Sequence, residues 1–179
     1  MSDKNIVLMG IKHCGKSTLG KMLAEEMKVQ FHDIDKIIEN NFHEKTLTVR
    51  EIHDIVKKEG FHKLETEAIC RNIGDDEISV ISLGGGTIDN EDAFECIAGT
   101  SIFVYLKEEP VALFKRIQDG GLPSFLKHTD PFSIFMKLYE NRTVLYEKKA
   151  DLIVEINGLD IKKAYEKLKE KLKEAGYVR

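Results

Sequence analysis

The sequence has few cysteines, and none of them are paired at the spacing of a metal or redox motif. Its three cysteines, Cys14, Cys70 and Cys96, are widely separated in 179 residues. A disulfide framework or a zinc site generally shows closely and regularly spaced cysteines. We therefore expect reduced thiols in a cytoplasmic protein, with Cys14 acting as a small side chain in a tight turn.

The chain also lacks a basic excess, a long apolar run and an apolar signal segment at its start. Its net charge of −4 argues against nucleic acid as a partner, because such proteins usually carry a basic patch. No run of 18 apolar residues predicts a membrane span. With 42% hydrophobic residues, the chain suits one well-buried core. We expect one soluble domain over residues 1–179.

The most informative feature is a phosphate-binding loop that reads Gly-Ile-Lys-His-Cys-Gly-Lys-Ser. It follows an apolar run and precedes a helix-forming stretch. The loop directs backbone N–H groups inward, and the helix N-terminus adds the positive end of its dipole. Lys16 can reach the β- and γ-phosphates, and Ser17 can ligate Mg²⁺. The residues predicted to bind the nucleotide here are Gly10, Ile11, Lys12, His13, Cys14, Gly15, Lys16, Ser17 and Thr18.

Strand and helix patterns alternate along the chain. The predicted strands cover residues 6–9, 29–34, 78–83, 101–106 and 152–156. The predicted helices cover residues 18–28, 35–41, 48–73, 91–98, 110–118, 132–149 and 160–175. Thr48 and Glu51 form a capping box, and Gly60 is expected to be a helix break or a close-packing point. This alternation predicts an α/β fold whose parallel sheet is covered on both faces.

Candidate ligand-binding residues follow the predicted strands, where open α/β sheets bind their ligands. Asp33 and Asp35 are two residues apart, which on an extended segment places both carboxylates on one side. One can hold Mg²⁺ through water while the other accepts a proton from an attacking hydroxyl; alternatively, they cap the next helix. Farther along, Gly84, Gly85 and Gly86 allow close approach of a small ligand.

Two later segments are candidates for substrate contact. Residues 119–124 have no helical or strand period and contain glycine and proline, which is typical of a mobile loop. We predict a lid over the phosphates at about residues 116–131. Arg142 can grip a substrate carboxylate with two hydrogen bonds, although a single arginine on a helix is more often a surface residue.

Taken together, these motifs resemble the shikimate kinase family. The motifs, in order, are the loop at residues 10–17, Asp33-Ile34-Asp35, Glu59-Gly60-Phe61 with Glu65, Gly84 to Gly86, and Arg142 to Tyr146. The resemblance spans nearly the whole chain. It implies a three-layer P-loop NTPase fold with a five-stranded parallel sheet of order 2-3-1-4-5. It also implies transfer of the γ-phosphate of ATP to shikimate, which gives shikimate 3-phosphate in the biosynthesis of chorismate and aromatic amino acids.

The resemblance also implies roles for individual residues. Lys16 would stabilise the transferring phosphoryl group, Ser17 and Asp33 would hold Mg²⁺, and Asp35 would orient or deprotonate the hydroxyl. The residues implied to bind the substrate are Asp35, His62, Gly84, Gly85, Gly86 and Arg142, with a substrate-binding helical segment at about residues 35–73. Arg116 and Asn157 are implied near the adenine, although both could equally be surface residues. Family members are often monomers.

The chain departs from the family pattern at two positions. His62 stands where the family has an arginine that binds the shikimate carboxylate, and Leu122 replaces the lid arginine. Lys115, Arg116 and Lys127 are candidates to replace the lid arginine. If a charged His62 binds the carboxylate, KM for shikimate should rise above pH 7.

These departures leave two alternatives to a shikimate kinase. The altered cations could suit another small hydroxy acid, gluconate among them, as the phosphate acceptor. The chain could instead be a nucleotide-binding regulator that has lost turnover.

Overall fold

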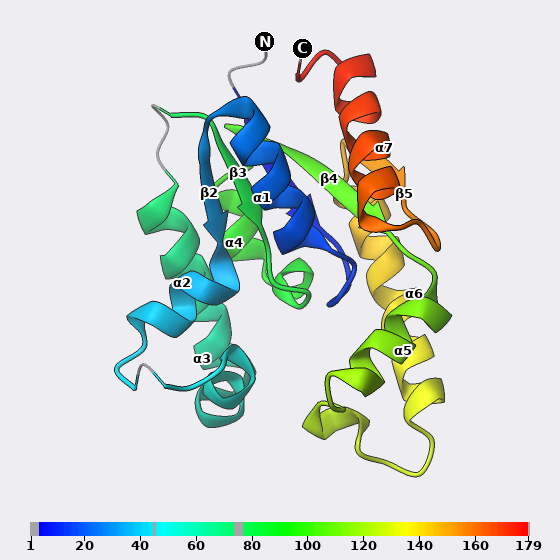
Figure 1. Ribbon diagram of the computed structural model, residues 1–179. Coiled ribbons are helices and arrows are strands. Elements are labelled where there is room, and N and C mark those ends of the chain that lie inside the picture. The colour runs from blue at the N-terminus through cyan, green and yellow to red at the C-terminus, as the bar shows by residue number, and fades with distance from the viewer. Residues whose placement is uncertain (1–3, 45, 74–76, 179) are drawn as a thin grey trace.

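The computed structural model describes residues 4–44, 46–73 and 77–178, and its centre is a parallel sheet (Figure 1). The five strands are β1 (Asn5–Met9), β2 (Gln30–Asp33), β3 (Ser79–Ser82), β4 (Ser101–Lys107) and β5 (Leu152–Glu155). Their order is β2-β3-β1-β4-β5, and every adjacent pair is parallel. The predicted fold class and strand order are confirmed.

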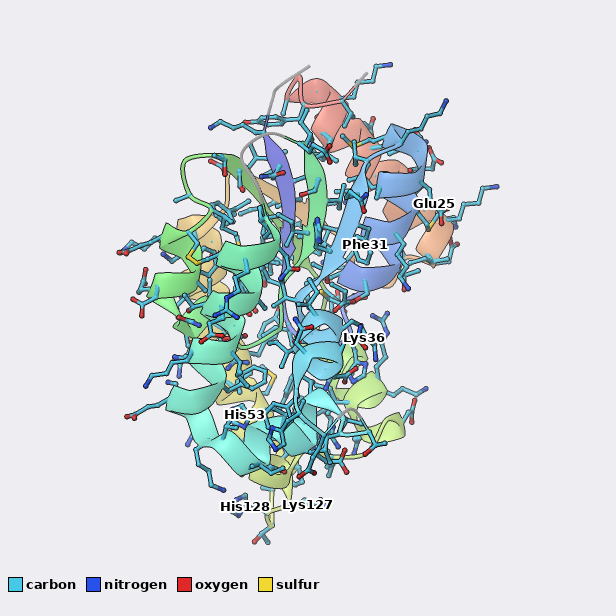
Figure 2. The ribbon with its side chains drawn as sticks, turned by 90° about the vertical axis from the view of Figure 1, so that its left-hand side faces the viewer. Glu25, Phe31, Lys36, His53, Lys127 and His128 are labelled. Carbon is cyan, nitrogen blue, oxygen red and sulfur yellow. A yellow bond between two sulfur atoms is a disulfide. The ribbon has the colours of Figure 1, made fainter. Side chains whose placement is uncertain are left out.

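Helices cover both faces of this sheet, as the side view shows (Figure 2). The helices are α1 (Lys16–Met27), α2 (Ile34–Asn41), α3 (Val49–Asn72), α4 (Glu91–Glu95), α5 (Pro110–Asp119), α6 (Pro131–Lys149) and α7 (Ile161–Glu174). Helices α1 and α7 lie on one face, and α3, α4 and α6 lie on the other. Every residue of β1 is buried, as expected for a central parallel strand covered on two sides. No helix in the described ranges is long and apolar enough to cross a membrane.

Helix α3 starts as predicted but breaks at a different residue. The backbone N–H of Thr48 donates to Glu51 at 2.8 Å and the N–H of Glu51 donates to Thr48 at 3.4 Å, which confirms the capping box. The break is at Lys57, whose φ of 60° is left-handed, and not at Gly60. Gly60 is instead the close-packing point, because a Cβ there would lie 2.9 Å from the Cβ of Val56.

The cysteine prediction was wrong for two of the three residues. Cys70, in the last part of α3, forms a disulfide with Cys96, which follows α4. The two cysteines are 26 positions apart with β3 between them, and the fold brings the ends of the two helices together. Sequence spacing did not reveal this contact. Cys14 is a free, buried thiol in the phosphate loop, as expected.

Candidate active site

The phosphate loop connects β1 to α1 and surrounds the Lys16 ammonium. Gly10 and Gly15 have φ values of 150° and 98°, which favour glycine. A Cβ on Gly10 would also lie 2.7 Å from the carbonyl oxygen of Leu106. Lys16 Nζ donates to the carbonyl oxygens of Gly10 at 2.8 Å and Ile11 at 3.1 Å. Lys16, Ser17 and Thr18 form the first turn of α1, so the loop and helix terminus can bind an anion.

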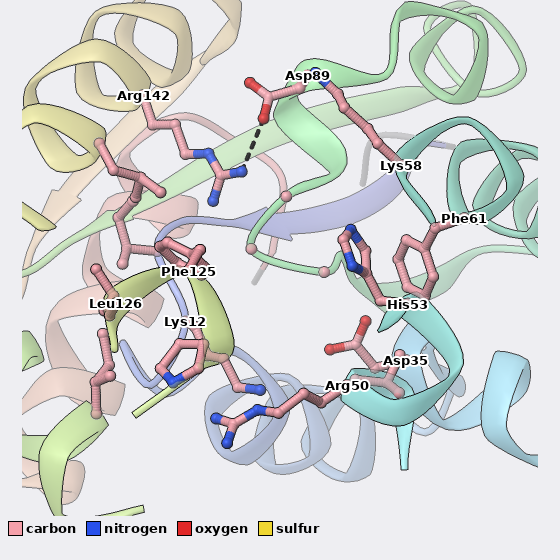
Figure 3. Close-up of a pocket in the computed structure, with 18 of the residues that line it drawn as sticks. Lys12, Asp35, Arg50, His53, Lys58, Phe61, Asp89, Phe125, Leu126 and Arg142 are labelled. Carbon is pink, nitrogen blue, oxygen red and sulfur yellow. Dashed lines mark hydrogen bonds and ion pairs between the residues drawn. The ribbon is translucent and has the colours of Figure 1, made fainter. Parts of the chain in front are cut away.

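Asp33 and Asp35 take different positions at the end of β2. Asp33 caps α2 and accepts a hydrogen bond from the N–H of Lys36 at 3.2 Å. Because α2 begins at Ile34, the prediction of an extended segment that aligns both carboxylates was wrong. Asp35 belongs to the first turn of α2 and lines a pocket (Figure 3). Burial raises the pKa of Asp35, and the nearby Lys16 partly opposes that shift.

The glycine run after β3 packs closely against both the phosphate loop and Asp35. A Cβ on Gly85 would lie 2.9 Å from the backbone nitrogen of Lys12, and one on Gly84 would lie 2.8 Å from Oδ1 of Asp35. The buried Tyr146 hydroxyl donates to the carbonyl oxygen of Gly85 at 2.8 Å and holds the run from α6. Side chains at these positions would close the approach to Asp35.

Glu65 is a buried carboxyl behind the glycine run. It is 1% exposed and accepts hydrogen bonds from Thr87 Oγ1 at 2.6 Å and Asn90 Nδ2 at 3.2 Å. Burial raises the pKa of Glu65 to about 7, even though both hydrogen bonds favour the ionised form. The sequence motif included this residue but did not indicate that it holds a proton near neutral pH.

One cavity of about 420 Å³ joins the phosphate loop to α3, the glycine run and α6 (Figure 3). The site residues predicted from sequence that line it are Ile11, Lys12, Asp35, His62, Gly84, Gly85, Gly86 and Arg142. The sequence did not indicate three basic residues that also line the cavity, Arg50, His53 and Lys58, all on α3. An alternation of helix and strand does not reveal which side of a kinked helix faces a cavity.

At the cavity end far from the phosphate loop, Arg142 is paired with an acid. Its Nη2 lies 2.8 Å from Oδ2 of Asp89, and the two side chains are 22% and 27% exposed. Burial, followed by the charge of Lys58, lowers the pKa of His62 below 6.5. This shift opposes a charged His62 in the protein without ligand, whereas a bound carboxylate would favour the charged form.

The two residues implied near the adenine lie outside this cavity but close to each other. Arg116 forms an ion pair with the buried Glu108 at 2.8 Å and donates to the carbonyl oxygen of His13 at 3.1 Å. Glu108 also accepts a hydrogen bond from the N–H of Gly158, the neighbour of the exposed Asn157, at 3.0 Å. Glu108 thus joins Arg116 to the turn after β5, beside the phosphate loop.

The oxygen donors next to the loop fit a magnesium ion that is held mainly by phosphate and water. The Ser17 hydroxyl is exposed and lies 3.4 Å from that of Ser82, while the Asp33 carboxylate is partly buried. Across the residues that the structure describes, no three His, Cys, Asp or Glu side chains cluster as a metal site would require. Mg²⁺ commonly takes one or two protein oxygens and fills its shell with water and phosphate.

The sheet order, the glycine loop at the start of α1 and the aspartates after β2 define a P-loop nucleotide-binding protein of the small-molecule kinase type. The family model for shikimate kinase matches residues 12–173. The shikimate kinase of Francisella tularensis subsp. novicida is 31% identical over 165 residues, which cover 92% of both chains. That of Shewanella loihica is 34% identical over 155 residues, 86% of this chain and 88% of the relative. The chain belongs to the shikimate kinase family.

Solved structures agree with this assignment. A shikimate kinase from Acinetobacter baumannii in complex with shikimate has a TM-score of 0.83 at 25% identity, covering 98% of this chain and 96% of that one. The enzyme from Bacteroides thetaiotaomicron has a TM-score of 0.79 at 27% identity, covering 97% and 98%. A gluconokinase from Sinorhizobium meliloti, at 17% identity and a TM-score of 0.62 with coverage of 97% and 93%, shares the fold.

Proposed function

We propose that this protein transfers the γ-phosphate of ATP to a hydroxyl of shikimate and so forms shikimate 3-phosphate. Family membership over 92% of the chain supports the reaction class. The observation that carries the proposal is the single cavity that runs from the phosphate loop past Asp35 to Arg142. Such a cavity can hold an anionic acceptor with its hydroxyl directed at a bound triphosphate.

On this proposal, Asp35 accepts the proton of the attacking hydroxyl. Burial raises its pKa, which makes the carboxylate a stronger base than an exposed aspartate. Lys16, inside the loop, offsets the negative charge of the transferring phosphoryl group. Phosphoryl transfer asks little covalent chemistry of a protein, so positioning and electrostatics supply most of the rate.

The nucleotide would lie along the phosphate loop, with its phosphates at the backbone N–H groups of residues 10–18. Arg116 and Asn157, which lie beside the loop, would flank the adenine. Ser17 and Asp33 would hold Mg²⁺, which neutralises phosphate charge when it is bound.

At the other end of the cavity, the acceptor carboxylate would bind Arg142. The guanidinium offers a planar pair of donors that matches a carboxylate. His62, neutral near pH 7 because its pKa is lowered, supplies one N–H donor and no fixed charge. Asp89 already pairs with Arg142, so the acceptor competes with it for that cation.

Gluconate is the second candidate acceptor. The pairing of Arg142 with Asp89 and the lowered pKa of His62 leave less positive charge for any carboxylate, so this end of the cavity does not by itself select shikimate over another monocarboxylate. The regulator hypothesis is weaker, because the loop, Lys16 and Asp35 are all in place. The proposal also includes a monomer in the cytoplasm that acts in aromatic amino acid biosynthesis, with no nucleic acid partner and no membrane association.

The test is ADP release with ATP and Mg²⁺ in the presence of shikimate, of gluconate, or of no acceptor, with the phosphorylated product identified by ³¹P NMR. We expect shikimate alone to stimulate release strongly. Stimulation by gluconate and not by shikimate would replace the proposed acceptor. Release at background with both acids, together with measurable ADP binding, would favour the regulator.

A further inference from the structure

Arg50 connects helix α3 to the loop after α5. It is the second residue of α3, and its Nη2 donates to the carbonyl oxygen of Gly121 at 3.0 Å. The hydrogen bond joins residues 71 positions apart in the chain. The guanidinium has five N–H donors, so this contact leaves most of them available.

The same guanidinium lies beside the phosphate loop. Arg50 and Lys12 line one end of the cavity, and Figure 3 shows both side chains extending toward the same region beside Asp35. The positive charge of Arg50 contributes to lowering the pKa of Lys12 and of His13. Only groups close in space repel in this way.

Lys12, Lys16 and Arg50 thus form a cluster of cations, and the acids whose charges reach it are Asp35, Asp33 and Glu39. Glu39 pairs with Lys36 at 2.6 Å and Asp33 caps α2. The like charges of Lys12, Lys16 and Arg50 repel one another, so an anion placed among these three cations relieves that repulsion. Its position between the phosphate loop and Asp35 is where the γ-phosphate must pass to reach a hydroxyl activated by Asp35. We therefore assign this cluster to binding the phosphoryl group, whereas the acceptor carboxylate is assigned to Arg142.

The three basic residues that the sequence offered as replacements for a lid arginine lie outside the cavity. Arg116 is tied to the buried Glu108 and to His13. Lys115 and Lys127 are exposed and do not line the cavity, and Lys127 lies at the tip of the molecule in Figure 2. The sequence-based candidates to replace a lid arginine are therefore less well placed than Arg50.

We propose that Arg50 is a catalytic residue that contacts the phosphoryl group during its transfer, an inference that rests on the proposed kinase function. The bond from the γ-phosphorus to the bridging oxygen breaks, and its electron pair stays on ADP. A bond forms from the γ-phosphorus to the acceptor oxygen, whose proton goes to Asp35. Arg50 keeps its own proton and stabilises the negative oxygens in the transition state.

Arg50→Met and Arg50→Lys test this role, with Arg71→Met as the matched control. Arg71 lies on the same helix, where it pairs with Glu67 at the surface. We expect Arg50→Met to lower kcat about 10²- to 10³-fold, as loss of one transition-state donor does. ADP affinity should change by less than about threefold, since the contact strengthens in the transition state. Arg50→Lys should recover part of the rate, and Arg71→Met should match the wild type.

A second measurement does not depend on turnover. The complex of ADP, aluminium fluoride and shikimate mimics the transferring phosphoryl group, and Arg50→Met should weaken its formation while ADP alone still binds. Thermal unfolding of each variant verifies that it folds, and Arg50→Lys serves as the test if Arg50→Met does not fold.

Three results would overturn the proposal. They are a kcat for Arg50→Met within about threefold of the wild type, a rise in KM alone, or unweakened formation of the fluoride complex. If the wild type turns over neither shikimate nor gluconate, the proposed function fails and this inference fails with it. An active wild type with a fully active Arg50→Met variant rejects the inference alone.

Discussion

The two ends of the cavity differ in how their charged side chains are paired. At the phosphate end, Lys12, Lys16 and Arg50 lie together beside Asp35, while the other acids there are engaged elsewhere, Glu39 with Lys36 and Asp33 as the cap of α2. At the acceptor end, three of the charged or titratable groups are balanced or suppressed. Arg142 is paired with Asp89. Burial raises the pKa of Glu65 to about 7, and burial also lowers the pKa of His62.

From this difference we expect the phosphate end to determine the rate of transfer and the acceptor end to determine which acceptor binds. A triphosphate brings several negative charges, which a group of neighbouring cations attracts strongly. An acceptor with a single carboxylate must instead displace the partner of Arg142, so small changes in its shape or charge alter its binding. We expect substitutions at the phosphate end to change kcat and those at the acceptor end to change KM.

The largest expected effect is that of Asp35→Asn, which removes the base and leaves the cations. We expect kcat to fall about 10²- to 10⁴-fold, the usual contribution of a general base. KM for shikimate should change far less, because Arg142 still holds the carboxylate. Steady-state ADP release measures both constants, and unchanged turnover would remove Asp35 from the mechanism.

The next effect concerns stability and comes from Glu65 at the acceptor end. Its pKa rises from 4.5 to about 7 on folding, so between these pH values the folded protein retains a proton that the unfolded chain releases. The free energy of unfolding should therefore fall as pH rises through this window, by about 3 kcal/mol from this group.

Denaturant unfolding at a series of pH values measures this slope. Other carboxyls contribute slopes of their own, so the decisive quantity is the difference between the wild type and Glu65→Gln. Glu67→Gln, at an exposed position of the same helix, is the control and should retain the wild-type slope. Equal slopes for the wild type and Glu65→Gln would show that Glu65 is ionised in the folded protein.

The smallest effect should come from Asp89→Asn, which frees Arg142. We expect KM for shikimate to fall about two- to fivefold with kcat unchanged, in line with the strength of a partly exposed ion pair. Asp92→Asn removes the same charge from an exposed position three residues along the chain and should have less effect. A higher KM for Asp89→Asn would mean that Asp89 positions Arg142 for the substrate.

Much of the fold and the phosphate end could be predicted because their signals are local. The glycine loop needs backbone geometry that only certain residues adopt at fixed spacing. Buried parallel strands such as β1 appear as short apolar runs, and helices carry caps such as Thr48 with Glu51. The strand order itself came from the resemblance, since alternation alone does not fix it.

The features that were missed depend on contacts between distant segments. Arg50 meets Gly121 across 71 positions, and Cys70 meets Cys96 through the packing of α3 and α4. The proton on Glu65 depends on burial by the glycine run, which no spacing within α3 reveals. Lys57 adopts a conformation that propensity assigns to the nearby Gly60.

The kink at Lys57 divides helix α3 into two helical segments that meet at one residue with non-helical backbone angles. The first segment places Arg50 at the end of the cavity beside the phosphate loop, and the second places His62 and Glu65 along the rest of the cavity. At the kink, the Lys57 ammonium donates a hydrogen bond to the backbone carbonyl oxygen of Asp54 at 2.6 Å. Because Lys57 itself does not line the cavity, a substitution there that changes the angle between the two segments should change the spacing of Arg50 and His62 without replacing any residue of the cavity wall.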